Sequence, residues 1–265
     1  MPAPAHYGDD QLLSRVREAL SALDSVTPLT LAPLDQFHIG GTAATVMLAE
    51  MAAVAPGELV LDVGCGLGGP ARILSVLGGA EVTGIDLAPA FCEVATLLND
   101  RCGLAERVSF QAADALALPF DDACFDLVWS QYVSMNIADR ARLYREMRRV
   151  LKPGGRIAVN DVVSVDGRPP HFPVPWARDE SQSHLVTTQE MQVLLADAGF
   201  DAGAWRDTTP VTLGWGRSRP APIRPSPLGL HLVLGPDLRE MVKNLHRAFE
   251  EGRLGTVMAV ARAIA

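Results

Sequence analysis

The sequence has few of the residues that form the disulfide bonds of secreted proteins or bind metal ions. Its 265 residues include only four cysteines, and no two of them form a Cys-x-x-Cys pair. Scattered thiols in a chain of this length are typical of a reducing compartment rather than of a disulfide framework. The histidines and cysteines also lack the clustered spacing of metal ligands. We therefore expect no metal site.

Positive charge is scarce as well. The chain has 23 Lys and Arg against 31 Asp and Glu, which gives a formal net charge of -8. A surface that binds nucleic acid concentrates Lys and Arg, and this sequence has no strong cluster of them. The composition therefore argues against a nucleic-acid partner.

Signals for secretion or membrane insertion are missing too. The first ten residues contain no basic region followed by an apolar one, so we expect no signal peptide. The most apolar early stretch, residues 42–56, is short and is interrupted by Glu50, so it is no membrane span. We expect a cytoplasmic protein with no membrane partner.

From Glu58 onward, short apolar runs alternate with helical stretches. Residues 139–151 show the helical pattern well, because Leu143, Met147 and Val150 fall on one side. The runs that we expect to be strands are residues 59–64, 81–86, 108–110, 125–130 and 156–160. Strands that are apolar throughout and alternate with helices predict a parallel sheet covered on both faces.

The segments on either side of this region have a different pattern. Before it we expect two helices joined by a loop, and after it long Pro-rich loops that cover a site. The expected elements are helices at 9–24, 42–55, 187–198 and 236–251, loops at 164–186 and 210–235, and a strand at 256–264. We expect one domain of 265 residues with a helical cap (1–57), a core (58–163), and loops, a lid helix and the last strands (164–265).

A glycine loop follows the first expected strand and has two interpretations. Gly64, Gly66 and Gly69 satisfy GxGxxG, the dinucleotide fingerprint, and Asp86 ends the next strand at about the expected distance. An NAD-dependent oxidoreductase is therefore a competing interpretation. Asp62, however, precedes the loop, where its carboxylate would repel a pyrophosphate but would suit an ammonium or sulfonium group.

Two further motifs follow in order. Asp114 lies just beyond the third expected strand and can accept from an adenine amino group, although it is also a common loop residue. A Lys-Pro-Gly-Gly turn at residues 152–155 precedes the fifth strand.

Together these motifs resemble the class I S-adenosylmethionine-dependent methyltransferases over residues 58–163. The resemblance implies a Rossmann-like α/β fold: a seven-stranded, mostly parallel sheet with an antiparallel last strand, helices on both faces, and N-terminal helices and inserted loops forming a lid. It also implies that the glycine loop approaches the methionine part of S-adenosyl-L-methionine and that Asp86 binds the ribose hydroxyls. The cofactor-binding residues expected on these terms are Asp62, Gly64, Cys65, Gly66, Asp86, Leu87, Asp114, Ala115, Ser130 and Gln131.

Three other segments, residues 35–38, 129–137 and 172–177, are similar to the sarcosine/dimethylglycine-type N-methyltransferases and their small-molecule relatives. This likeness implies catalytic roles for His38 and Tyr132. It implies substrate-binding roles for Phe37, Met135, Asn136 and Trp176. Structural alternatives stay open: His38 as a helix cap, Met135 as a core residue and Trp176 as the anchor of its own loop.

The expected chemistry is methyl transfer to a small molecule. A sulfonium is already an activated methyl donor, so the protein mainly has to hold acceptor, methyl carbon and sulfur in line. A neutral amine can attack without a strong base, whereas a phenol or an acidic carbon must first lose a proton. We favour methylation of an amine nitrogen. The alternatives are O- or C-methylation of a natural-product-like molecule, the NAD-dependent oxidoreductase, and a non-methylating protein that retains the cofactor.

Overall fold

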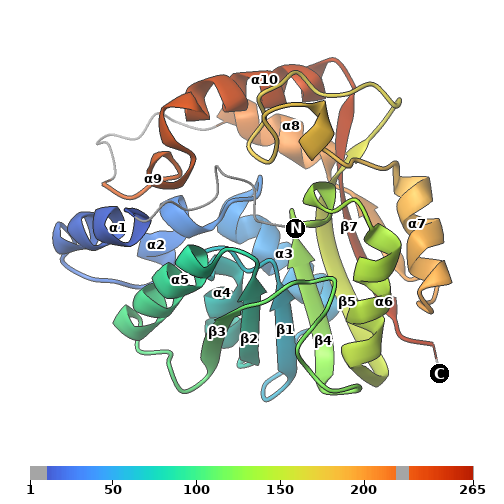
Figure 1. Ribbon diagram of the computed structural model, residues 1–265, viewed down its shortest axis with the longest axis horizontal. Coiled ribbons are helices and arrows are strands. Elements are labelled where there is room, and N and C mark those ends of the chain that lie inside the picture. Colours follow the sequence, from blue (N-terminus) through green and yellow to red (C-terminus); the bar gives the residue numbers. More distant parts are fainter. Residues whose placement is uncertain (1–10, 219–226, 265) are drawn as a thin grey trace. The chain divides into compact units, whose positions relative to one another are not determined.

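The computed structural model describes residues 11–218 and 227–264. Its strands form one seven-stranded sheet in the order β3-β2-β1-β4-β5-β7-β6, flanked by helices (Figure 1). The strands are β1 (Leu59–Val63), β2 (Glu81–Asp86), β3 (Val108–Ala112), β4 (Phe125–Gln131), β5 (Leu151–Ser164), β6 (Ala204–Asp207) and β7 (Leu254–Arg262). β1, β2 and β3 pair in parallel, as do β4 and β5, whereas β7 runs antiparallel to β5 and β6. The predicted fold class, including the antiparallel last strand, is confirmed.

The chain divides into two compact units. Among the described residues, the first unit comprises 11–115 and 227–236, and the second comprises 116–218 and 237–264. The finer division into cap, core and lid at 57/58 and 163/164 stays a prediction. None of the helices within the described ranges is both long and apolar enough to cross a membrane.

The first unit holds β1, β2 and β3 together with the N-terminal helices and α9. These helices are α1 (Leu12–Ser21), α2 (Pro28–Asp35), α3 (Gly41–Ala52), α4 (Gly69–Gly78), α5 (Pro89–Arg101) and α9 (His231–Leu234). α1 packs against α5 and α9, and α2 packs against α3 and α4. Val60, Leu61 and Val63 of β1 are fully buried, as expected for a strand covered by helices.

The prediction of a loop between the first two expected helices is wrong in part, because this segment contains α2. Thr27 caps this helix by accepting a hydrogen bond from the backbone N–H of Thr30, and the Thr30 hydroxyl in turn accepts from the backbone N–H of Thr27. Pro28 follows at the first helical position, where a missing N–H costs nothing. The prolines therefore mark the start of a helix here rather than its absence.

The second unit holds β4 to β7 and the C-terminal helices. Its helices are α6 (Arg140–Val150), α7 (Thr188–Asp197), α8 (Thr209–Ser218) and α10 (Leu238–Glu250), with short 3-10 turns at Ser134–Asn136, Glu180–Gln182 and Gly235–Asp237. α6 packs against α7 and β5, and α8 and α10 pack against each other and against β7 (Figure 1).

Two further sequence expectations need correction. The loop predicted over residues 210–235 contains α8 and α9, and residues 219–226 of it lie outside the described residues. The fifth strand begins at Leu151 rather than at Arg156, and the Lys-Pro-Gly-Gly turn is an irregularity within it. Leu151 pairs with Phe125 and the next pair joins Arg156 to Leu127, so several residues of β5 bulge out of the ladder.

Candidate active site

The glycine loop adopts a backbone conformation that is unfavourable for residues with a Cβ. Gly64, Gly66 and Gly68 have φ angles of 74°, 52° and 79°. At Gly68 a Cβ would also lie 2.4 Å from Cζ of Phe110, so the loop lies against β3 at this point. The backbone N–H of Gly64 donates to the carbonyl of Ile85 at 2.8 Å, which ties the loop to β2.

Asp86, the last residue of β2, faces this loop. Its Oδ2 accepts from the backbone N–H of Gly66 at 3.0 Å, and its Oδ1 accepts from that of Ala88 at 2.9 Å. Burial raises the pKa of Asp86, and backbone hydrogen bonds from Ala88, Gly66 and Leu87 oppose that shift. An ionised carboxylate has about four acceptor positions, so these backbone donors leave Asp86 with capacity for a further hydroxyl donor.

Asp62, in β1, is the second carboxylate beside the loop. Its side chain is buried, with 2% of its surface exposed, and Oδ2 makes no hydrogen bond to any residue that the structure describes. Burial raises the pKa of Asp62 to about 7, and repulsion from Asp86 adds to the shift. A buried acceptor of this kind needs an explanation, and a cationic ligand group supplies one.

The other residues predicted to bind cofactor in the first unit lie beside these carboxylates in the sequence or shortly after β3. The Cys65 thiol is buried, and burial raises its pKa, so it contributes shape rather than a thiolate. Leu87 follows β2 and is 40% exposed, which leaves an apolar surface beside Asp86 in the sequence. Asp114 and Ala115 follow β3 and are half-buried.

Phe37 and His38 precede α3. The Phe37 ring lies against the glycine loop, since a Cβ at Gly66 would be 3.3 Å from its Cε2. His38 is buried, and its Nε2 lies 3.0 Å from both the Gly41 carbonyl and the Thr45 hydroxyl. Because the carbonyl can only accept, Nε2 carries the proton of the neutral ring. Burial lowers the pKa of His38 to about 4, so the imidazole is neutral near pH 7.

A buried ion pair that the sequence did not reveal supports this arrangement. Arg72 of α4 donates to Asp35 of α2 at 2.8 Å and to the carbonyl of Leu67 in the glycine loop at 2.5 Å. It also donates to the Ala95 carbonyl of α5 at 3.2 Å, and both charged side chains are fully buried. Arg72 therefore joins two helices to the loop, and an arginine within an otherwise apolar helix was the available signal.

The second unit brings the residues predicted after β4 together on one short loop. Tyr132 has a φ of 58°, and its N–H donates to the Asn160 carbonyl of β5 at 2.8 Å. Met135 is buried, and Asn136 donates through Nδ2 to the Val133 carbonyl at 3.2 Å.

Ser130 and Gln131 end β4 and are both buried. The Ser130 hydroxyl has no hydrogen-bond partner within residues 11–218 and 227–264, whereas Gln131 accepts from the indole of Trp129 at 3.0 Å. Trp176 lies farther along the chain, is 2% exposed and donates to the Ser183 hydroxyl at 3.0 Å. The structure therefore gives Trp176 a partner within its own loop.

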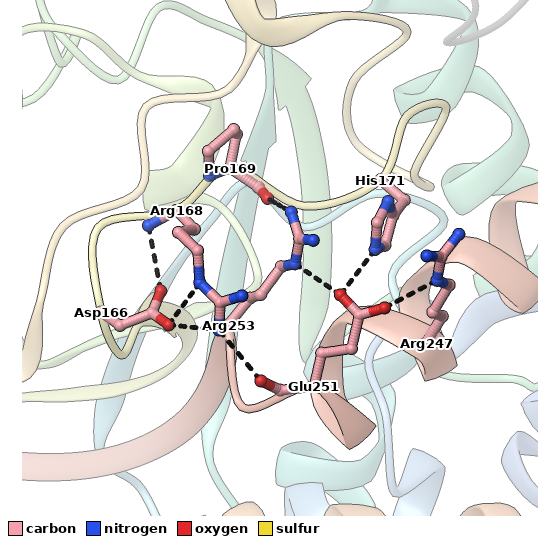
Figure 2. A network of polar contacts seen from close by, with 7 residues as sticks. All are labelled: Asp166, Arg168, Pro169, His171, Arg247, Glu251 and Arg253. Carbon is pink, nitrogen blue, oxygen red and sulfur yellow. Dashed lines mark hydrogen bonds and ion pairs between the residues drawn. The ribbon is translucent and has the colours of Figure 1, made fainter.

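A polar network in the second unit, centred on Glu251, ties the start of the Pro-rich segment to the turn after α10 (Figure 2). The Glu251 carboxylate accepts from Arg247 at 2.7 Å, from His171 at 2.8 Å and from Arg253 at 2.7 Å. Arg253 also donates to the Pro169 carbonyl at 3.0 Å. The hydrogen bonds from His171, Arg247 and Arg253 lower the pKa of Glu251 to about 2.

This network predicts a stability effect with a defined pH dependence. The pKa of Glu251 is depressed, so its contribution is present above the ordinary value of 4.5 and is lost as the pH falls through about 2. Glu251→Gln should lower the melting temperature at pH 7 in dilute salt, and the difference from wild type should shrink at high salt and at low pH. The neighbouring Glu250→Gln, at an exposed position, is the matched control. An equal effect of both substitutions would contradict the prediction.

Comparison with known proteins agrees with this geometry. Residues 61–159 match the family described as methyltransferase domain. This similarity favours the methyltransferase interpretation of the glycine loop over the dinucleotide one.

Among curated proteins, methyltransferase GfsG of Streptomyces halstedii is 42% identical over 130 residues, covering 49% of this chain and 47% of that protein. The 27-O-demethylrifamycin SV methyltransferase of Amycolatopsis mediterranei is 32% identical over 179 residues, covering 64% of each. The matches thus span about half of the first relative and less than two thirds of the second.

Among solved structures, the geranyl diphosphate C-methyltransferase of Streptomyces coelicolor A3(2) aligns over 100% of both chains with a TM-score of 0.70 and 19% identity. The [4+2]-cyclase SpnF aligns over 100% of this chain and 99% of its own, with a TM-score of 0.66 and 24% identity. At these identities the likeness shows the fold alone. The relatives include O-, C- and N-methyltransferases, and the sarcosine/dimethylglycine type is not singled out among them.

Proposed function

We propose that the protein transfers the methyl group of S-adenosyl-L-methionine to a small-molecule acceptor. The observation that carries this proposal is the pair of carboxylates beside the glycine loop. Asp86 has capacity for a further hydroxyl donor, which suits the ribose, and the open Oδ2 of Asp62 suits the ammonium group of the methionine part. When bound, the cofactor supplies a methyl group already activated by a sulfonium.

Other residues complete the proposed cofactor set. Gly64, Cys65 and Gly66 provide a backbone surface without large side chains, and the exposed Leu87 would pack against the adenine ring. Asp114 and Ala115 would contact the adenine edge. Ser130, with its open hydroxyl, and Gln131 would contribute from the end of β4.

For the acceptor atom we propose an amine nitrogen. Among the residues predicted to contact the acceptor, His38 is the candidate base. Burial lowers its pKa to about 4, however, which makes it a weak base near pH 7. A neutral amine attacks through its own lone pair and loses its proton afterwards, so it does not depend on such a base. We propose that His38 and Tyr132 orient the acceptor and that Phe37, Met135, Asn136 and Trp176 bind it.

Two observations favour other outcomes and define the test. Curated relatives include tocopherol O-methyltransferase of Arabidopsis thaliana, 47% identical over 100 residues, and one fold neighbour is a [4+2]-cyclase. The protein should be incubated with methyl-labelled cofactor and a panel of amines, phenols and acidic carbon acids. Label on amines supports the proposal. Label only on phenols or carbon acids would replace the amine assignment, and cofactor binding without turnover of any acceptor would point to a non-methylating protein.

The acceptor assignment also predicts how two substitutions behave. His38→Ala and Trp176→Ala should lower turnover at least tenfold while cofactor affinity stays within a few-fold, because neither carries the proposed cofactor contacts. Matched controls are His246→Ala, at an exposed position of α10, and Trp205→Ala on β6. If His38 is only a cap for α3, stability will fall by about 1 kcal/mol with normal turnover. Normal turnover in both variants would remove these residues from the acceptor site.

A further inference from the structure

The loop that follows β4 contains a backbone conformation that must be held in place. Tyr132 has a φ of 58°, in the left-handed region that a residue with a Cβ disfavours. Such conformations persist when surrounding contacts determine them, and they are frequent where a side chain has to be presented to a ligand. The contacts around Tyr132 therefore show which residues hold its backbone in this conformation.

A single carboxylate binds the two residues that follow Tyr132. Asp161 lies on β5, directly after the Asn160 whose carbonyl accepts from the Tyr132 N–H. Its Oδ1 accepts from the backbone N–H of Val133 at 3.1 Å, and its Oδ2 accepts from the hydroxyl of Ser134 at 2.6 Å. Both oxygens of Asp161 are thus hydrogen-bonded to the loop.

This carboxylate lies in an environment that opposes its charge. Asp161 is fully buried, and burial raises its pKa, while the nearby positive charge of Arg140 acts in the other direction. Arg140 is itself buried at the start of α6 and donates to the His184 carbonyl at 2.7 Å. The backbone N–H of His184 in turn donates to the Met135 carbonyl at 2.8 Å, so the far end of the same loop is held through Arg140.

A buried charge is expensive, and a well-packed apolar residue often gives a fold of equal or greater stability. We propose that Asp161 is a positioning residue that holds the loop at residues 132–136 in the conformation that presents Tyr132 and Asn136 to the methyl acceptor. This inference rests on the proposed function, because it assumes that these two residues contact the acceptor. Asp161 itself touches only Val133 and Ser134 of the loop and has no contact role with substrate.

The first test measures positioning without turnover. Ser134→Ala removes the contact to Oδ2 and leaves the Asp161 side chain in place. Amide hydrogen exchange of residues 132–136 should become at least tenfold faster in this variant, while exchange in α7 and β7 stays at the wild-type rate. Unchanged exchange in the loop would overturn the proposal, whether or not the protein methylates the acceptors tested.

The second test measures the catalytic consequence. In folded Asp161→Ala and Ser134→Ala variants, kcat should fall at least tenfold and cofactor affinity should stay within threefold. Asp161→Asn, which keeps the shape and one acceptor oxygen, should recover part of kcat. Asp126→Ala is the matched control, because Asp126 pairs with Lys152 at a part-exposed position of the same pair of strands.

A double-mutant cycle separates positioning from a purely structural role. Tyr132→Gly removes one of the two presented side chains and permits the positive φ, so Ser134→Ala should lower kcat less in that background than in wild type. Independent effects that multiply would overturn the proposal, as would a wild-type kcat in folded Asp161→Ala. Should wild type turn over no acceptor, the proposed function fails, and the exchange measurement still decides whether Asp161 holds the loop.

Discussion

Asp86→Ala should weaken S-adenosyl-L-methionine binding at least tenfold. The proposed ribose contact is a charge-assisted hydrogen bond worth roughly 1.5–3 kcal/mol, and its loss at the lower limit corresponds to about tenfold in affinity. The same substitution removes the acceptors for the N–H groups of Gly66 and Ala88. The glycine loop should therefore lose part of the shape that the cofactor requires, which adds to the effect.

Calorimetric titration of the apoprotein with cofactor measures this change directly. Asp86→Asn keeps an acceptor oxygen for one of the two backbone N–H groups but has no charge, so its affinity should lie between wild type and Asp86→Ala. Asp100→Ala is the matched control, at an exposed position of α5 in the same unit. Wild-type affinity in a folded Asp86→Ala protein would show that this carboxylate does not hold the ribose.

The local parts of the candidate site were predictable from the sequence because they depend on spacing along the chain. An apolar run followed by Gly64 and Gly66 marks the end of a parallel strand, and Asp86 ends the next such run. The carboxyl ends of neighbouring parallel strands meet at one edge of a sheet, so these residues had to lie close together. The hydrogen bond from Gly66 to Asp86 is the structural outcome of that rule.

The contacts that support the site were not predictable, because they join residues far apart in the sequence. Arg72 pairs with Asp35, 37 positions away, and neither periodicity nor a motif indicates that partner. Asp161 lies in an apolar strand, where its role depends on a loop 27 and 28 residues earlier in the chain. Contacts between residues so far apart depend on tertiary packing, which cannot be inferred from a single sequence.

Errors in the predicted elements have a common cause in the treatment of Pro and Gly. Pro28 lies in the segment predicted as a loop between the first two helices, although it occupies the first position of α2, where Pro is favourable. Gly154 and Gly155 predict a turn before the fifth strand, whereas β5 already begins at Leu151. At Gly155 a Cβ would lie 2.9 Å from the Lys152 carbonyl oxygen, so the glycine allows a tight bulge within the strand.

Asp62→Asn should stabilise the apoprotein at pH 8 and weaken cofactor binding at the same time. Burial and the charge of Asp86 raise the pKa of Asp62 from its ordinary value of 3.8 to about 7 in the folded state. Between these two pH values the folded state binds more protons than the unfolded state, so stability falls as the pH rises. A shift of about three pK units corresponds to a loss of about 4 kcal/mol above pH 7, at 1.36 kcal/mol per unit.

The asparagine side chain does not titrate, so it avoids this loss. Its oxygen can still accept from the Ala71 backbone, the contact that lowers the Asp62 pKa in the wild type. Its amide nitrogen, however, takes the place of Oδ2, which has no partner among the described residues, and this offsets part of the gain. We expect Asp62→Asn to raise the free energy of unfolding by about 2–4 kcal/mol at pH 8, with a difference near zero at pH 4.

Cofactor binding should respond in the opposite direction. The ammonium group of the methionine part would neutralise the Asp62 carboxylate in the wild type, and a neutral amide offers no charge for that purpose. Affinity should therefore fall at least tenfold at pH 8, where the wild-type carboxylate is ionised. Denaturant unfolding at pH 4, 6 and 8 and cofactor titration at pH 8 measure the two effects on the same samples, with Asp100→Asn as the control. A variant that is less stable at pH 8 and binds cofactor as tightly as wild type would show that Asp62 serves the fold rather than the ligand.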